Sequence, residues 1–162
     1  MKARSIATTL IVWLALMVSL GCGTGDQGRF EQSGYTECSE CNLANADLRN
    51  LRYVDNVRVD LYWANLAKAN LSGANLNIAG LRRADLSGAD LSGANLTRAD
   101  LSGADLSGAN LTRADLAYAY LIGANLTDAD LTDADLAGAN LKYVIGADFS
   151  GAQNVPAKYL KD

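Results

Sequence analysis

The stretch LSGADLSGANLTRAD at residues 86–100 occurs again, letter for letter, at residues 101–115. Around it, from Leu61 to Leu141, a leucine falls at every fifth position, seventeen in succession. Alanine almost always stands two residues before the leucine, and Asp or Asn one residue before it. The exceptions are Val59, Gly80 and Tyr120. The repeating unit of this chain is therefore five residues long.

A period of five excludes a continuous helix and a continuous strand. Five residues turn an α-helix through about 140°, which scatters the leucines around the cylinder. On a strand, an odd step places successive leucines on opposite faces. The chain must therefore change direction once per pentad. Ala and Leu then point inward from a very short strand, and the next two residues, mostly Ser, Thr, Gly and Asp, form the corner.

The pattern A-D/N-L-x-x resembles that of the pentapeptide-repeat family, from about Thr36 to Ala152. The resemblance implies an all-β fold. The expected architecture is a right-handed, four-sided (quadrilateral) β-helix solenoid over residues 36–153, with one pentad per side and four per coil.

The charged corners independently favour four pentads per coil over three. Three would stack four cations in one column about 4.8 Å apart, where like charges repel. These cations are Lys68, Arg83, Arg98 and Arg113. Four pentads instead place Arg113 beside Asp133 and give Trp63 and Tyr118 an arginine neighbour each, so that cation–π contacts can form. The fifteen-residue copies are then three pentads long and step around the coil, which makes them duplicated scaffold and not a repeated binding site.

The register breaks at both ends of the repeat. The step from Tyr53 to Leu61 is eight residues, which predicts an insertion within residues 54–59. A second step of eight separates Leu141 from Phe149. In the tail, Asn154 precedes a proline and several apolar residues, as an N-cap does, so we expect a short capping helix within residues 154–162.

The N-terminus is typical of an export signal at residues 1–21. Lys2 and Arg4 precede an apolar run that is short for a membrane span and ends at Cys22. This resembles a bacterial lipoprotein signal, which implies lipidation of Cys22, although Ser19 departs from the aliphatic residue that such signals prefer. An uncleaved anchor and a plain secretory peptide are the alternatives. Residues 22–35 are polar and glycine-rich, as expected of a tether.

Cys38 and Cys41 take a Leu position and an Ala position in the register, so both are expected to point into the first coil. In an oxidising compartment they can form a disulfide that holds this end together. Redox or metal chemistry is the alternative, but no second Cys pair and no His completes a zinc site.

Composition narrows the functional classes further. The chain contains no His, the commonest general acid/base and metal ligand. Without Lys2 and Arg4 the formal charge is −6, compared with −4 for the whole chain, which argues against nucleic-acid binding. Asp or Asn stands before the leucine in nearly every pentad, and we call these residues the Asp and Asn ladder. Because they recur throughout the repeat, they belong to the consensus of the fold and do not mark a catalytic site. We expect no enzymatic activity, no cofactor and no metal.

Departures from the consensus gather on one side of the predicted coil and on the corner that adjoins it. We call these ten residues the aromatic–arginine surface. They are Tyr62, Trp63, Ile78, Arg82, Arg83, Arg98, Tyr118, Tyr120, Ile122 and Tyr143, with Lys142 on the same side. Exposed aromatic and Arg residues have the composition of a protein interface. Stacking along the coil, or covering of its ends, explains them equally well.

The sequence thus predicts a non-catalytic, membrane-anchored envelope lipoprotein that faces the periplasm or another extracytoplasmic space and binds an unidentified protein partner. One alternative follows from the family resemblance, since some members are similar to duplex DNA in shape and charge and block DNA gyrase. That function would require a cytosolic, strongly acidic rod. The other alternative is a thiol redox protein that uses Cys38 and Cys41.

Overall fold

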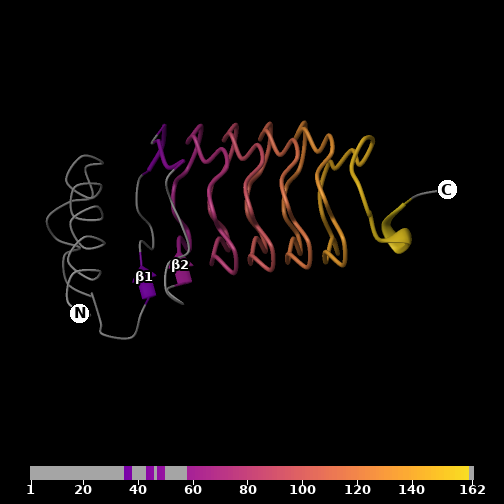
Figure 1. Cartoon of the computed structure of the whole chain (residues 1–162), viewed down its shortest axis with the longest axis horizontal. Coiled ribbons are helices and arrows are strands. Elements are labelled where there is room, and N and C mark those ends of the chain that lie inside the picture. The colour runs from indigo at the N-terminus through magenta and orange to yellow at the C-terminus, as the bar shows by residue number, and fades with distance from the viewer. Residues whose placement is uncertain (1–34, 38–42, 46, 50–57, 161–162) are drawn as a thin grey trace, which may run out of the picture.

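The computed structural model describes residues 35–37, 43–45, 47–49 and 58–160, which form a stack of coils along one axis (Figure 1). Its regular elements are strand β1 (Tyr35–Glu37), strand β2 (Arg58–Asp60) and the 3₁₀ helix η1 (Ala157–Tyr159). β1 pairs in parallel with β2, so that Thr36 lies opposite Val59. Between β2 and η1, each pentad meets its neighbours through parallel bridges one residue long.

The bridges fix the number of sides. Asn65 pairs with Asp85, Asp85 with Asp105, and Asp105 with Asn125, so residues twenty apart lie above one another. Twenty residues are four pentads. The predicted four-sided coil is therefore confirmed, and the corner residues stack in the columns expected from the sequence.

The interior of the coil is lined by Ala and Leu alone over most of its length. Every such side chain from Leu61 to Leu141 is buried, and Leu101 has none of its surface exposed. The described residues include no buried polar or charged side chain. The five-residue period thus sends two side chains per pentad inward and leaves three positions for the outside.

One pentad, residues 84–88, shows how the backbone is satisfied. The Asp85 N–H donates to the coil before it, while the N–H groups of Leu86 and Gly88 donate to the coil after it. The Ala84 N–H closes the preceding corner by donating to the Leu81 carbonyl at 3.2 Å. Only the Ser87 N–H lacks a backbone acceptor. The Asp85 Oδ1 atom accepts it at 3.0 Å.

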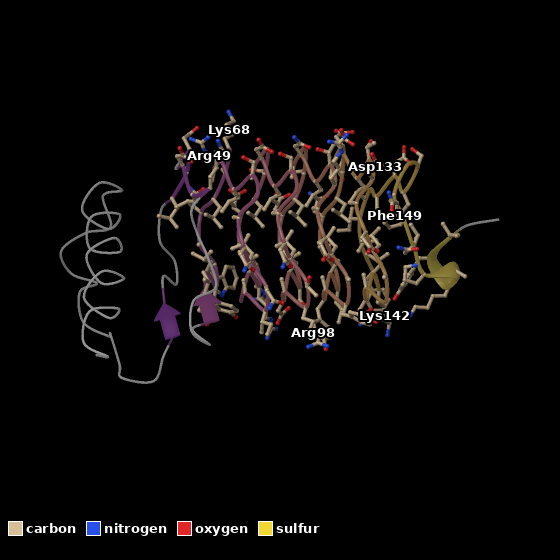
Figure 2. All side chains as sticks on the ribbon, viewed as in Figure 1. Arg49, Lys68, Arg98, Asp133, Lys142 and Phe149 are labelled. Atoms are coloured by element: carbon tan, nitrogen blue, oxygen red, sulfur yellow. The ribbon has the colours of Figure 1, made fainter. Side chains whose placement is uncertain are left out.

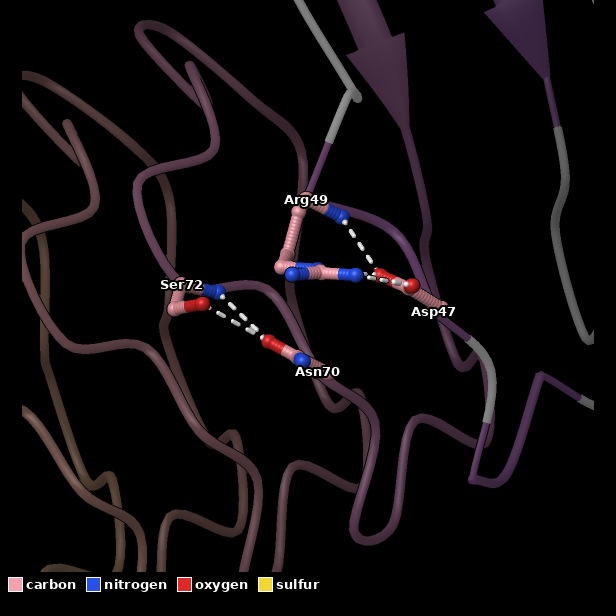
Figure 3. A network of polar contacts seen from close by, with 4 residues as sticks. All are labelled: Asp47, Arg49, Asn70 and Ser72. Carbon is pink, nitrogen blue, oxygen red and sulfur yellow. Dashed lines mark hydrogen bonds and ion pairs between the residues drawn. The ribbon is translucent and has the colours of Figure 1, made fainter.

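This remaining N–H explains the Asp and Asn ladder. A carboxylate or amide oxygen at the position before Leu reaches the N–H two residues later and completes the corner. Figure 3 shows the contact in two consecutive coils. Asn70 accepts from the N–H and hydroxyl of Ser72, and Asp47 accepts from the N–H and guanidinium of Arg49. The ladder is accordingly a structural element of each turn.

The second corner residue of every pentad from 61 to 143 has a positive φ, whether or not it is glycine. Gly73 has φ +66°, as a turn of this kind favours. Ile78 has φ 60° although its side chain is β-branched. A left-handed backbone costs a non-glycine residue about 1–2 kcal/mol. Large side chains are therefore present at these corners despite the free-energy cost of the left-handed backbone.

At the N-terminal end, the pairing offset is three residues longer than one coil. Tyr35 pairs with Arg58 and Asp47 with Asn70, each 23 residues apart. The extra residues must lie between positions 47 and 58, in agreement with the predicted insertion, most of which falls outside the described residues.

At the C-terminal end the second step of eight is a shortened pentad. Asp135 pairs with Gln153, only 18 residues away. The missing two residues bring Gly146 against Thr127, where an added Cβ would lie 2.8 Å from the Thr127 Cα atom. Only glycine fits at this close approach.

The tail corrects one expectation. Asn154 does not cap the helix, because Pro156 precedes η1 and no side chain caps it. Asn154 instead adopts φ 54° and donates from Nδ2 to Asp135 Oδ1 at 3.0 Å. The helix itself is one 3₁₀ turn, and the Tyr159 hydroxyl lies 3.1 Å from Asn140 Oδ1. In the part of the chain that the structure describes, no helix is both long and apolar enough to cross a membrane.

Candidate interaction surface

The aromatic–arginine surface occupies one side of the coil and one adjoining corner. In Figure 2, Arg98 and Lys142 project from one long edge of the stack, whereas Arg49, Lys68 and Asp133 project from the opposite edge. In this view the labelled residues of the aromatic–arginine side therefore lie at the opposite edge of the stack from those of the other sides.

The large apolar side chains on this surface are solvent-exposed. Tyr118 is 59% exposed, Tyr120 51% and Tyr143 72%. Among the described residues, most exposed large hydrophobic side chains belong to it. They are Trp63, Ile78, Tyr118, Tyr120, Ile122 and Tyr143, and the two outside the predicted set are Ile145 and Leu160. Such side chains gather here while the other sides carry mostly small polar corners, which marks an apolar patch.

Each cation on this side lies over an aromatic ring. The Arg83 guanidinium is 4.8 Å from the centroid of the Trp63 ring, and that of Arg98 is 6.0 Å from the Tyr118 centroid. Both pairs were expected from the columns. The Lys142 ammonium lies 4.7 Å from the Tyr143 centroid. Cation–π attraction thus holds charge and ring together on the outside of the coil.

Arg82 links three consecutive coils. Its guanidinium is 6.0 Å from the Tyr62 centroid in the coil below and 3.8 Å from Asp100 in the coil above. The ladder position in its own coil is Gly80, which has no side chain. The Tyr62 ring also meets Trp63 edge to face, with centroids 5.8 Å apart.

Gly80 and Tyr120 replace the ladder Asp or Asn on this side. Neither can accept the following N–H, and the N–H groups of Arg82 and Ile122 have no acceptor within the described residues. Tyr120 thus gives up a turn hydrogen bond and places an exposed aromatic ring in the middle of the side. This departure lowers the stability of the corner, so the fold does not account for it.

The second corner residues of this side are likewise not explained by the needs of the fold. In the Trp63 column, the equivalent positions Gly103 and Gly123 show that the coil accepts glycine there. Trp63, Arg83 and Tyr143 nevertheless adopt φ between 57° and 63°. Strained backbone that carries exposed aromatic and cationic side chains is a feature of functional sites.

Three carboxylates at other positions have a lowered pKa, and the causes are local turn contacts. The hydrogen bond from the Arg49 guanidinium lowers the pKa of Asp47 to about 2. Donation from the Thr132 side chain, then its N–H, lowers the pKa of Asp130. Donation from the Ser150 N–H, then its hydroxyl, lowers that of Asp148. These carboxylates are exposed and behave as turn acceptors.

Several predicted sites lie outside the described residues, namely Cys22, Cys38 and Cys41, together with residues 1–34. Within the described part, no group of three or more His, Cys, Asp or Glu side chains is arranged to hold a metal ion. Sequence reasoning missed Ile145, which follows the surface at its C-terminal end and is 58% exposed. Its pairing with Asn125 shows that it takes a ladder position, a fact hidden by the shortened pentad that follows.

Comparison with known proteins agrees with this geometry. The family model of pentapeptide repeats matches residues 57–93, 79–116 and 109–153. The chain belongs to the pentapeptide-repeat family. A pentapeptide repeat protein from the cyanobacterium Cyanothece 51142 is 30% identical in its crystal structure, with a TM-score of 0.51, and the match covers 81% of this chain and 96% of that one.

Two further crystal structures are similar to this pentapeptide-repeat protein. One is a pentapeptide repeat protein from Nostoc PCC 7120, at 41% identity and a TM-score of 0.47, with 48% of this chain and 64% of that chain covered. The other is QnrB1, a plasmid-mediated fluoroquinolone resistance protein, at 27% identity and a TM-score of 0.49, with 71% and 62% covered. The chain thus spans 64% of the length of the Nostoc protein. A search of curated proteins finds no match.

Pentapeptide-repeat proteins form right-handed quadrilateral β-helices and are generally non-enzymatic structural or binding proteins. The four-sided coil described above is that fold.

Proposed function

We propose that this pentapeptide-repeat protein is an exported, non-catalytic binding module that captures a protein partner on its aromatic–arginine surface. The observation that carries the proposal is Tyr120. Its ring replaces a turn acceptor that nearly every other pentad has, and it is half exposed, between the exposed Tyr118 and Ile122 in the sequence. Aromatic and Arg residues dominate the energetics of protein interfaces.

The proposal includes an anchor. We propose that residues 1–21 direct export, that Cys22 carries a lipid, and that residues 22–35 tether the β-helix to an extracytoplasmic membrane face. The support is the sequence alone, with two cations, a short apolar run and a cysteine at its end. The same compartment would allow Cys38 and Cys41 to form the structural disulfide, and intact mass with and without reduction and alkylation tests that bond.

The test of partner capture is photo-crosslinking in cells that express the full chain natively. One variant carries the photo-reactive residue at Ile122 and its matched control carries it at Thr132. Both are exposed first corner residues, but Thr132 lies on the opposite side. We expect a discrete crosslinked species from position 122 and none from 132. Equal crosslinking at both positions, or none at 122, contradicts the proposal.

The test of the anchor is the intact mass of the protein after membrane fractionation. A chain that begins at Cys22 and is heavier by a lipid is the expected result, and Cys22→Ser should abolish the added mass. An unprocessed, unlipidated chain in the cytosol would contradict export. It would also favour the DNA-mimic alternative, to which the acidic corners Asp128 and Asp133 on the other sides are suited.

A further inference from the structure

Among the described residues, the cations of the aromatic–arginine side differ from Arg49 and Arg113 in what holds them, while Lys158 lies over the Tyr159 ring in the C-terminal tail. On the aromatic–arginine side, Arg82, Arg83, Arg98 and Lys142 each lie over a ring. On the other sides, Arg49 pairs with Asp47 at 2.7 Å and Arg113 with Asp133 at 4.0 Å. The two groups differ electrically, because a carboxylate neutralises its cation and an aromatic ring does not.

The stacked cations therefore keep their charge. Within the described residues, Arg83, Arg98 and Lys142 form no ion pair, and Arg82 has only the 3.8 Å contact with Asp100. Stacking occupies the flat face of a guanidinium and leaves the N–H donors at its edge free for a carboxylate. The surface thus presents preorganised cations whose donor groups remain available, on a chain whose net charge is −4.

We infer that the partner captured by the proposed function is an acidic protein segment, whose carboxylates pair with Arg83, Arg98 and Lys142. Apolar residues of that segment pack on Tyr118, Tyr120 and Ile122. Complementary charge selects the partner and speeds association, while the exposed rings supply contact area.

The spacing of the cations suits a segment that runs along the stack. Arg83 lies on this side and Arg98 on the adjoining corner, three pentads further along the same coil, and Lys142 lies three rungs beyond Arg82. At about 4.8 Å per rung, the cations span about 14 Å. An anionic lipid surface fits less well, because peripheral membrane helices insert a continuous apolar face and this surface has only two aliphatic residues, Ile78 and Ile122.

The experiment is a peptide-display selection on the full chain held in detergent micelles, with three proteins compared. These are the wild type, R83Q/R98Q and R113Q. The control Arg113 occupies the same corner position, with φ 58° against 57° for Arg83 and Arg98, but faces Asp133. Glutamine keeps most of the side-chain length and removes the charge, so the fold is unaffected by design.

We expect the wild type to enrich peptides that combine Asp or Glu with apolar residues. Their affinity should fall about tenfold or more in R83Q/R98Q, remain unchanged in R113Q, and decrease as NaCl rises from about 0.05 to about 0.5 M. Circular dichroism of each variant confirms that the coil is intact.

Enrichment of neutral or basic peptides, equal affinity for R83Q/R98Q, or no enriched peptide would overturn the inference. So would binding to phosphatidylcholine–phosphatidylglycerol vesicles that R83Q/R98Q loses while no peptide binds, which would assign the face to lipid. Crosslinking at Ile122 that persists in R83Q/R98Q contradicts only the inference that the partner is acidic, and leaves the proposed function intact. Absence of crosslinking there contradicts the proposed function itself.

Discussion

The guanidinium of Arg83 lies 4.8 Å from the centroid of the Trp63 ring, and both residues hold a left-handed backbone, at φ 57° and 59°. They are second corner residues of successive coils in one column. Glycine takes the next two positions of that column, Gly103 and Gly123. The fold therefore tolerates removal of both side chains, and the contact exists at a cost in backbone strain. Mutations that remove these strained side chains should consequently stabilise the fold and weaken binding at the surface.

Ile78→Gly should stabilise the protein by about 0.5–1 kcal/mol. Relief of a β-branched side chain at φ 60° outweighs the greater freedom that glycine gives the unfolded chain. The control is Asn77→Gly, one residue earlier, where φ is not positive and glycine should destabilise by a similar amount. Urea unfolding followed by circular dichroism measures both. A larger loss of stability for Ile78→Gly than for Asn77→Gly would refute the strain argument.

Tyr120→Asn should separate binding from folding. Asparagine restores the ladder acceptor for the Ile122 N–H, so the free energy of unfolding should stay the same or rise by up to about 1 kcal/mol. Removal of the half-exposed ring should abolish crosslinking from position 122. The converse variant, Asn75→Ala, deletes the acceptor of the Asn77 N–H and should cost about 1 kcal/mol. Retained crosslinking in Tyr120→Asn would remove Tyr120 from the site.

Gly146→Ala should be far more destabilising than Gly73→Ala. Both glycines have φ near +66°, so both substitutions carry a backbone cost of about 1 kcal/mol. At Gly73 an added Cβ meets nothing within 4 Å, whereas at Gly146 it meets the Thr127 backbone. We expect about 1 kcal/mol at Gly73 and about 3 kcal/mol or more at Gly146. Similar unfolding midpoints for the two variants would show that the shortened pentad can relax.

The fold was predictable because a period of five has few physical solutions. The resemblance to the pentapeptide-repeat family implies four pentads per coil, and the charged corners favour four over three. The neighbours of Arg83, Arg98 and Arg113 follow from that number. The contact of the Asp and Asn side chains with the N–H two residues later then accounts for the ladder.

Other features could not be predicted from the sequence. A step of eight between Leu141 and Phe149 fits three added residues or two missing ones, and only the pairing of Asp135 with Gln153 decides between them. Propensity also places Asn154 as a helix cap, but the nearby Asp135 carboxylate binds its side chain instead. Ile78 and Trp63 occupy backbone that propensity assigns to glycine, so their strain appears only in the structure.

Hydrogen bonds in the folded turns make the stability of the coil depend on pH. The pKa values of Asp130 and Asp148 are lowered from 3.8 because the folded turns donate hydrogen bonds to their carboxylates. A group whose pKa is lower in the folded state contributes stability that is fully present above its unfolded pKa and disappears as pH falls through its folded pKa. Asp47, with a pKa of about 2, acts in the same sense. Stability should therefore decline from about pH 4 to about pH 2.

The variant D130N/D148N tests the origin of that decline. Asparagine still accepts the N–H groups of Thr132 and Ser150, as Asn110 does for Thr112 at 3.1 Å, but it does not titrate. We expect melting temperatures close to wild type near neutral pH and a shallower decrease between about pH 4 and about pH 2. Thr132→Val leaves Asp130 in place and removes the donor that lowers its pKa most, so it should also flatten the curve. An unchanged slope in both variants would show that other carboxylates control the acid sensitivity of the coil.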